Sequence, residues 1–461
     1  MGEKVKLKRT LTLRYLVAFG LAYLAPTVVF NYYGIITQSS GGMMAFAYVI
    51  TTCVMFFTAF SYMQMVKAFP KAGSVYTYVQ QGVNSHVGFI AGWLILLDYL
   101  LLPMICYLLF GIYMNEFFPA LPTPVWVLSS LVLSGLINIV GVKTAGVINT
   151  VIIACQILFT LAFCVMCIRY VLEGGGQLFT SKAFFNPDTF SLGGMLGSSS
   201  ILCVSFLGFD AVTTMAEETK DPEKTVSKAI LIIAVGAGVL FAVVSYFSQA
   251  AWPNAFAEIQ DPDTGIFELL PMLGGEAMST IFLITDNLAT FICAMAGLAA
   301  VSRILYGMGR DGVLPGRVFG KLSKRFRTPV NNIIITSAIA LSALLYSDNL
   351  MGAASLVSFG ALTGFILVNF SVFSFYYLKS GKRSGGGNIF RYVIMPFIGV
   401  AVCIGLWISI NANAKILGVI WLVIGFVYLA VTTKGFKEKP ALMAIEEDIE
   451  IDGEREDDEA L

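Results

Sequence analysis

The sequence contains few of the residues that build metal sites, catalytic triads and charged surfaces. Among its 461 residues there is one histidine, His86, and only 13 % are charged, with 29 basic and 29 acidic side chains that cancel. A single histidine argues against a histidine-based metal site and against a Ser-His-Asp triad. A net charge of zero provides no electrostatic field that attracts nucleic acids. Since soluble domains have about 25 % charged residues, this shortage also excludes an ordinary soluble enzyme.

Two short motifs match cofactor sites but lie in the wrong surroundings. Cys164 and Cys167 form a C-x-x-C pattern in an unbroken apolar run with no second cysteine pair, so we assign them to packing. The stretch from Gly307 to Gly312 matches G-x-G-x-x-G, but it follows a long apolar helix where a dinucleotide site would need a strand. We therefore expect neither a metal nor another cofactor, and no role in nucleic-acid binding.

Long hydrophobic runs are what the sequence has in abundance. Hydrophobic residues make up 57 % of the chain, and the mean hydropathy is +0.80. A helix that crosses a bilayer needs about 20 mostly apolar residues, and twelve segments meet this condition. The sequence therefore predicts an all-α polytopic membrane protein that is surrounded by the lipid bilayer. The expected spans cover about 13–37, 43–66, 88–115, 125–142, 146–170, 195–215, 228–251, 277–306, 330–346, 352–378, 392–410 and 414–433.

The charged residues indicate how these spans are oriented. We expect one transmembrane domain over 13–433, between a cytoplasmic N-terminal segment, 1–12, and an acidic cytoplasmic tail, 434–461. With twelve spans and both ends in the cytoplasm, 26 of the 29 Lys and Arg residues fall on the cytoplasmic side, as the positive-inside rule requires. The external loop 252–275 has four acidic residues and no basic residue. This loop either concentrates cations at an entrance or is simply solvated.

Two of the expected spans contain helix-breaking residues near their centres. The first contains Gly20 and Pro26, and the sixth contains Gly208 close to the charged Asp210. Proline removes a helical hydrogen bond, and unwound backbone at membrane depth is tolerated only where it lines a cavity or is buried in protein. Because the breaks are five spans apart, they match the offset of a 5+5 inverted repeat. Paired breaks of this kind mark the binding site of secondary transporters.

Three carboxylates lie inside expected spans: Asp98 in the third, Asp210 in the sixth and Asp286 toward the outer end of the eighth. Charges at such positions are costly and by default functional. No Lys or Arg lies deep in any span, so the balancing charge must come from a proton, a metal cation or a cationic substrate. Two carboxylates in one cavity would suit a substrate with an amine at each end. Aromatic residues nearby would either stack on a cation or simply pack: Tyr23, Tyr99, Phe206 and Phe209.

Several longer stretches resemble the amino acid–polyamine–organocation superfamily, and within it the bacterial putrescine importers. Phe-Pro-x-Ala-Gly from Phe69 and Ser-Arg-x-Leu-Tyr from Ser302 are typical of the whole superfamily. Phe-Leu-Gly-Phe-Asp-Ala-Val-Thr-Thr from Phe206 and Leu-Asp-Tyr-Leu-x-Leu-Pro-Met from Leu97 are more specific to the importers. The resemblance extends from about residue 10 to 435 and implies a multi-pass protein of the bacterial inner membrane.

The resemblance also implies a fold and a site. The fold would be the inverted-repeat fold of this superfamily, with broken helices 1 and 6, repeats over about 13–170 and 195–378, and two added helices over about 392–433. The site would lie between spans 1, 3, 6, 8 and 10, with Asp210 at the position that handles the substrate amine in related exchangers and Asp98 at an importer aspartate. The substrate-binding residues expected on this basis are Asp210, Asp98, Tyr23, Tyr99, Phe206, Gly208, Phe209, Ala22 and Pro26.

Two positions depart from the importer pattern. The importers have Asp where this chain has Asn31, and a small polar residue where it has Asp286. We expect a secondary transporter, not an enzyme, that imports a small amine, most of all putrescine; the alternatives are an amino acid/amine exchanger and a basic amino acid permease. Proton symport fits the buried carboxylates best, with Asp210, Asp98 and Asp286 as proton-coupling or gate residues, and sodium coupling stays open.

Overall fold

The fold is almost entirely helical. The computed structural model describes residues 9–70, 75–140, 145–310, 312–347 and 349–440. Within these ranges the extended structure consists of one isolated bridge between Leu11 and Thr219. The predicted all-α class is therefore confirmed.

Ten helices in the described ranges are long and apolar enough to cross a membrane, and Val330–Tyr346 is a shorter apolar helix. All twelve predicted spans overlap helical segments, although positions 141 and 142 of the fourth lie outside the described residues. The first span falls on three short helices, α1 (Leu13–Leu24), α2 (Val28–Asn31) and α3 (Tyr33–Ser39). The number of membrane crossings and the inverted repeat stay predictions. The helices within the other spans are α4 (Met44–Ala68), α6 (Ser85–Phe117), α7 (Thr123–Val140), α8 (Ala145–Tyr170), α9 (Leu192–Leu202), α10 (Pro222–Ala251), α12 (Ile266–Arg310), α13 (Val330–Ala340), α14 (Leu350–Val372), α16 (Met395–Ile408) and α17 (Ala412–Thr432).

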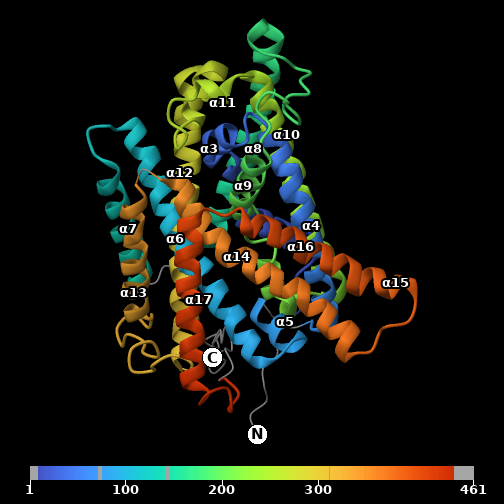
Figure 1. The fold of residues 1–461 in the computed structure, drawn as a ribbon. Helices are drawn as coiled ribbons and strands as arrows, with labels where there is room; N and C mark the ends of the chain where they lie inside the picture. The colour runs from blue at the N-terminus through green and yellow to red at the C-terminus, as the bar shows by residue number, and fades with distance from the viewer. Residues whose placement is uncertain (1–8, 71–74, 141–144, 311, 348, 441–461) are drawn as a thin grey trace, which may run out of the picture.

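Short helices lie at the two ends of the molecule (Figure 1). The helices α3 and α11 (Ala255–Glu258) are at one end, and α5 (Val75–Gly82) is at the other. We call these the α11 end and the α5 end. Another short helix, α15 (Gly386–Ile389), precedes α16 at the side of the molecule.

The helix α6 forms the centre of the structure. It begins after Asn84, whose side-chain oxygen accepts a hydrogen bond from the Val87 N–H at 2.9 Å and caps the helix. It packs against α5, α7, α12, α14 and α17. Almost all of its side chains are apolar, and most of them are buried. A helix that is apolar all round and buried needs partners on every side, and these neighbours supply them.

The peripheral helices α8 and α17 expose their apolar side chains. On α8, Leu158 and Val165 are 69 % and 63 % exposed, and on α17 Val423 and Val427 are more than half exposed. Continuous apolar surfaces of this kind are costly in water. They are suited to contact with lipid.

Both predicted breaks are present. The helix α1 ends at Leu24; Ala25 then has a φ of 51°, outside the helical region, and Pro26 lacks the N–H that would continue the helix. The helix α9 ends at Leu202 and continues as a tight 3-10 turn to Phe206, after which Gly208 has a φ of 112°. Only glycine adopts this conformation without strain. A second 3-10 segment, Ala211–Glu218, follows.

The two broken segments are joined by backbone hydrogen bonds at the α5 end. The N–H groups of Thr10 and Leu11 donate to the Glu218 carbonyl oxygen at 2.8 and 3.0 Å, and the Lys220 N–H donates to the Leu11 carbonyl oxygen at 3.1 Å. The residues before α1 therefore form a short strap, Thr10–Leu11, against the end of the second broken segment.

Candidate functional site

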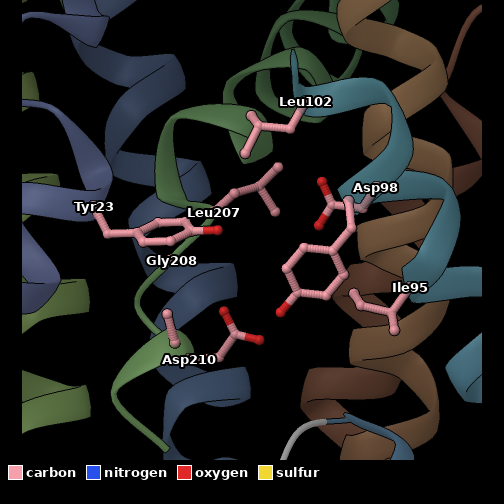
Figure 2. Close-up of a pocket in the computed structure, with 9 residues that line it drawn as sticks. Tyr23, Ile95, Asp98, Leu102, Leu207, Gly208 and Asp210 are labelled. Atoms are coloured by element: carbon pink, nitrogen blue, oxygen red, sulfur yellow. The ribbon is translucent and has the colours of Figure 1, made fainter. Parts of the chain in front are cut away.

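A small pocket lies where the two breaks meet the middle of α6. Figure 2 shows the side chains of Tyr23, Asp98 and Asp210 pointing into the same space from three different segments. The cavity volume is about 10 Å³, which is about the space that one water molecule needs. The lining residues are Tyr23, Ile95, Asp98, Tyr99, Leu102, Leu207, Gly208, Asp210 and Ala211.

Asp210 owes its position to the second break. It is the residue that precedes the 3-10 segment, so its side chain leaves the backbone where the chain turns after Gly208. The Tyr62 hydroxyl of α4 donates a hydrogen bond to Asp210 Oδ2 at 3.2 Å. One carboxylate oxygen is thus held by the protein, and the group still faces the pocket (Figure 2).

The two breaks touch each other through Tyr23 and Gly208. A Cβ atom built on Gly208 would lie 2.1 Å from Tyr23 Cδ1, so the Tyr23 ring packs directly on the glycine backbone. Gly208 is therefore required twice, once for its positive φ and once for this close approach. The contact places the aromatic face of the first broken segment beside Asp210.

Asp98 reaches the pocket from the rigid helix α6. It is 7 % exposed and interacts electrostatically with Asp210. In the described part of the chain, no Lys or Arg forms an ion pair with either carboxylate; the ion pairs Arg169–Glu173 and Lys434–Glu438 are both exposed and lie elsewhere. A buried carboxylate, Asp98, and a half-buried one, Asp210, without a basic partner require protons or a cation for neutrality. The pocket can therefore bind an organic cation or protons.

The structure brings five of the predicted site residues into the pocket lining, namely Tyr23, Asp98, Tyr99, Gly208 and Asp210. Their role in substrate binding stays a prediction.

The other predicted site residues are not in the lining. Phe206 is fully buried against Tyr48 and Phe241, and Phe209 is fully buried against Tyr62 and Phe365. These two rings pack behind the break and hold it in place.

Two predicted residues belong to the first break. Pro26 is buried just beyond the end of α1 and does not line the pocket. Ala22 lies on α1, but its side chain is outside the part of the chain that the structure describes.

Asp286 lies in a different place from the pocket. It is 1 % exposed, and its Oδ1 accepts a hydrogen bond from the Thr27 hydroxyl at 2.7 Å. Asn31 lies beside the same carboxyl group and interacts with it electrostatically. The two positions at which the chain departs from the importer pattern, 31 and 286, therefore lie close together. Asp286 contacts the first broken segment through Thr27, and its place toward the outer end of its span stays a prediction.

Sequence reasoning missed several residues of the site. Ile95 and Leu102 are three positions before and four after Asp98, so helical periodicity could have placed them on the same face of α6. Leu207 and Ala211 flank the second break, where the irregular backbone offers no periodicity by which to place them. Tyr62 gave no signal, because it lies 148 residues from Asp210 in the sequence.

Among the described residues, no group of three or more His, Cys, Asp or Glu side chains is arranged to hold a metal ion. The pocket lining itself offers carboxylates, phenols and backbone groups.

Comparison with known proteins gives consistent matches. The model of the amino acid permease family matches residues 16–441. The low-affinity putrescine importer PlaP of Escherichia coli (strain K12) is 36 % identical over 437 residues, which cover 94 % of this chain and 96 % of that protein. The branched-chain amino acid permease BcaP of Bacillus subtilis (strain 168) is 25 % identical, with coverage of 92 % and 93 %. Cationic amino acid transporter 2, vacuolar, of Arabidopsis thaliana is 27 % identical over 82 % of this chain and 61 % of that protein.

Proposed function

Because the chain belongs to the amino acid permease family, within the amino acid–polyamine–organocation superfamily, we propose that it is a secondary transporter that imports putrescine or a closely similar organic cation. The family consists of transporters, so the protein is a multi-pass membrane protein with a small-molecule substrate and not an enzyme. The putrescine importer PlaP, which matches over nearly the whole chain, supports putrescine as the substrate.

The observation that carries this proposal is the pair of carboxylates in one pocket. Asp98 and Asp210 face the same space from different segments, and no basic side chain of the described residues pairs with them. A diamine is a cation at both ends and would neutralise both groups. The rings of Tyr23 and Tyr99 line the same pocket and would stack on its ammonium groups or its methylene chain.

The transport cycle follows from the closed pocket. A pocket with a volume of about 10 Å³ is too small for a diamine. The broken segments must therefore move apart before the substrate enters. Substrate would then neutralise Asp210 and Asp98, the broken segments would close over it, and opening on the other side would release it. Rocking of one bundle against the other is the usual way in which such folds alternate access.

We propose protons as the driving ion. Once the amine has left, Asp98 and Asp210 face each other without a cation, and a proton on one of them removes their repulsion. Asp286 is the further candidate for proton coupling. The α5 end would face the cytoplasm of a bacterial cell, with both chain ends there, as the distribution of Lys and Arg along the sequence supports.

Uptake of radiolabelled putrescine into proteoliposomes tests the proposal. We expect saturable uptake that an imposed inward proton gradient drives, that sodium does not replace, and that amines block. The competitors would be spermidine, ornithine, lysine and γ-aminobutyrate. Uptake that requires an amine or amino acid inside the vesicles would indicate an exchanger instead, and absence of putrescine uptake in every condition would refute the proposal.

A further inference from the structure

Asp286 lies in a buried polar cluster that the central pocket does not include. Besides the Thr27 hydroxyl on Oδ1, the Thr290 hydroxyl donates to Asp286 Oδ2 at 3.4 Å. Asn31 completes the cluster, and its Oδ1 accepts a hydrogen bond from the Tyr113 hydroxyl at 3.4 Å. No Lys or Arg in the described ranges pairs with Asp286. A carboxylate that is buried in this way by default has a function that involves a cation.

This cluster is too far from the central pocket to share a small substrate with it. Asp286 interacts electrostatically with Cys106 and with Tyr113 of α6. These residues come eight and fifteen positions after Asp98 on the same helix, which corresponds to about 12 to 22 Å along the helix axis. A four-carbon diamine is shorter than this span, so we expect it to occupy the two carboxylates in turn.

Aromatic rings surround the cluster on its outer side. Phe282 lies one helical turn before Asp286 on α12, and its ring packs against Phe30, Tyr113 and Phe267 with centroid distances of 5.5, 6.0 and 5.5 Å. The faces of such rings attract ammonium groups, more strongly where water is excluded. A carboxylate beside several aromatic rings is suited to an organic ammonium group.

An open cavity lies next to these rings toward the α11 end. It has a volume of about 150 Å³, and Ile112 and Glu116, which flank Tyr113 on α6, line it together with Asp261 and Asp263. The two aspartates come from the acidic loop 252–275, so that loop contributes carboxylates to the cavity. Clustered acidic side chains raise the local concentration of cations.

We propose that Asp286 is an outer binding site for one ammonium group of the substrate, occupied between the acidic cavity and the central pocket. This inference rests on the proposed function. In the closed structure the hydroxyls of Thr27 and Thr290 donate to the carboxylate. When the first broken segment moves, the N–H groups of the ammonium replace these donors with charge-assisted hydrogen bonds, and the rings of Phe30 and Phe282 cover its carbon chain.

The variant Asp286→Asn separates this role from a structural one. Asparagine keeps an oxygen that accepts the Thr27 hydrogen bond but removes the charge. We would measure the KM for radiolabelled putrescine in right-side-out and in inside-out membrane vesicles. The expected result is a KM about tenfold higher for entry from the outer side, as for the loss of a charge-assisted hydrogen bond, and a KM within about twofold of wild type from the inner side.

Two further variants make this test specific. Glu276→Gln removes an exposed carboxylate from the same helix and should leave both KM values unchanged. Combining Asn31→Asp with Asp286→Asn moves the carboxylate across the contact and should restore most of the outer affinity.

Three outcomes would overturn the inference. An unchanged outer KM in Asp286→Asn would do so while leaving the proposed function intact, as would an equal rise of KM on both sides. Absence of putrescine uptake by the wild-type protein would remove the proposed function itself, and this inference with it.

Discussion

Trp93 and Trp421 exchange hydrogen bonds: the indole N–H of each donates to the backbone carbonyl oxygen of the other, both at 2.9 Å. Their rings are stacked, with centroids 4.7 Å apart and planes at 18°. Trp93 belongs to the central α6 and Trp421 to the peripheral α17. This reciprocal pair therefore attaches α17 to the helix that carries Asp98.

Removing one half of the pair should destabilise the protein without abolishing transport. Trp421→Phe keeps the stacking but loses one hydrogen bond and leaves the Trp93 carbonyl oxygen without its donor. We expect a loss of about 1 kcal/mol, measured as a lower thermal unfolding midpoint in detergent, with uptake per folded molecule unchanged. The control is Trp126→Phe, because the Trp126 indole N–H has no partner among the described residues. An equal loss of stability in the control would contradict this explanation.

Gly208→Ala should strongly reduce transport. An alanine there would have to adopt a positive φ, and its methyl group would lie 2.1 Å from the Tyr23 ring. The second break and Asp210 would therefore shift. Uptake of putrescine should fall at least about tenfold, since displacements of about 1 Å at a site have effects of this size. Gly236→Ala on α10 is the matched control, because a Cβ atom there meets nothing within 4 Å. Normal uptake by Gly208→Ala would show that the contact with Tyr23 is dispensable.

The two pocket carboxylates should differ in their importance. Asp210→Asn removes the charge at the break that must close over the substrate and should abolish uptake. Asp98→Asn removes a charge from the continuous helix α6 and should weaken uptake strongly, because Asp210 remains at the break to bind an amine. Both variants should be present in the membrane at wild-type levels, as immunoblotting can verify. Asp188→Asn, in an exposed loop, controls for loss of a negative charge. Wild-type uptake by Asp210→Asn would be incompatible with the proposed site.

Tyr62→Phe should raise the KM for putrescine without abolishing transport. The substitution removes the hydroxyl that donates to Asp210 Oδ2 at 3.2 Å and leaves the ring contacts with Phe209 and Phe365. We expect a KM about fivefold higher, as for the loss of one hydrogen bond of about 1 kcal/mol. Tyr33→Phe removes a buried hydroxyl that has no partner among the described residues and should leave the KM unchanged. Identical KM values in the two variants would mean that Tyr62 does not orient Asp210.

The breaks were predictable from the sequence because their causes are local. Pro26 ends α1 through its missing N–H, and Gly208 allows a backbone conformation that other residues avoid. Asp98 and Asp210 were predictable for a similar reason, since a carboxylate within an apolar run is conspicuous. These four residues were therefore enough to predict from the sequence where the pocket lies.

The partners of these residues were not predictable, because they come from distant parts of the chain. Thr27 and Asp286 are 259 positions apart, and neither position indicates the other. Phe206 and Phe209 adjoin the break as closely as Leu207 does, but the irregular backbone there directs both rings into the packed interior. The direction in which a side chain leaves an irregular backbone depends on the tertiary fold.

The strap formed by Thr10 and Leu11 has a mechanical consequence. Its backbone hydrogen bonds join the residues before the first broken segment to the end of the second, at Glu218 and Lys220. A movement of either segment at the α5 end would therefore move the other with it. We expect a fluorophore attached next to Thr10 to report this coupled motion.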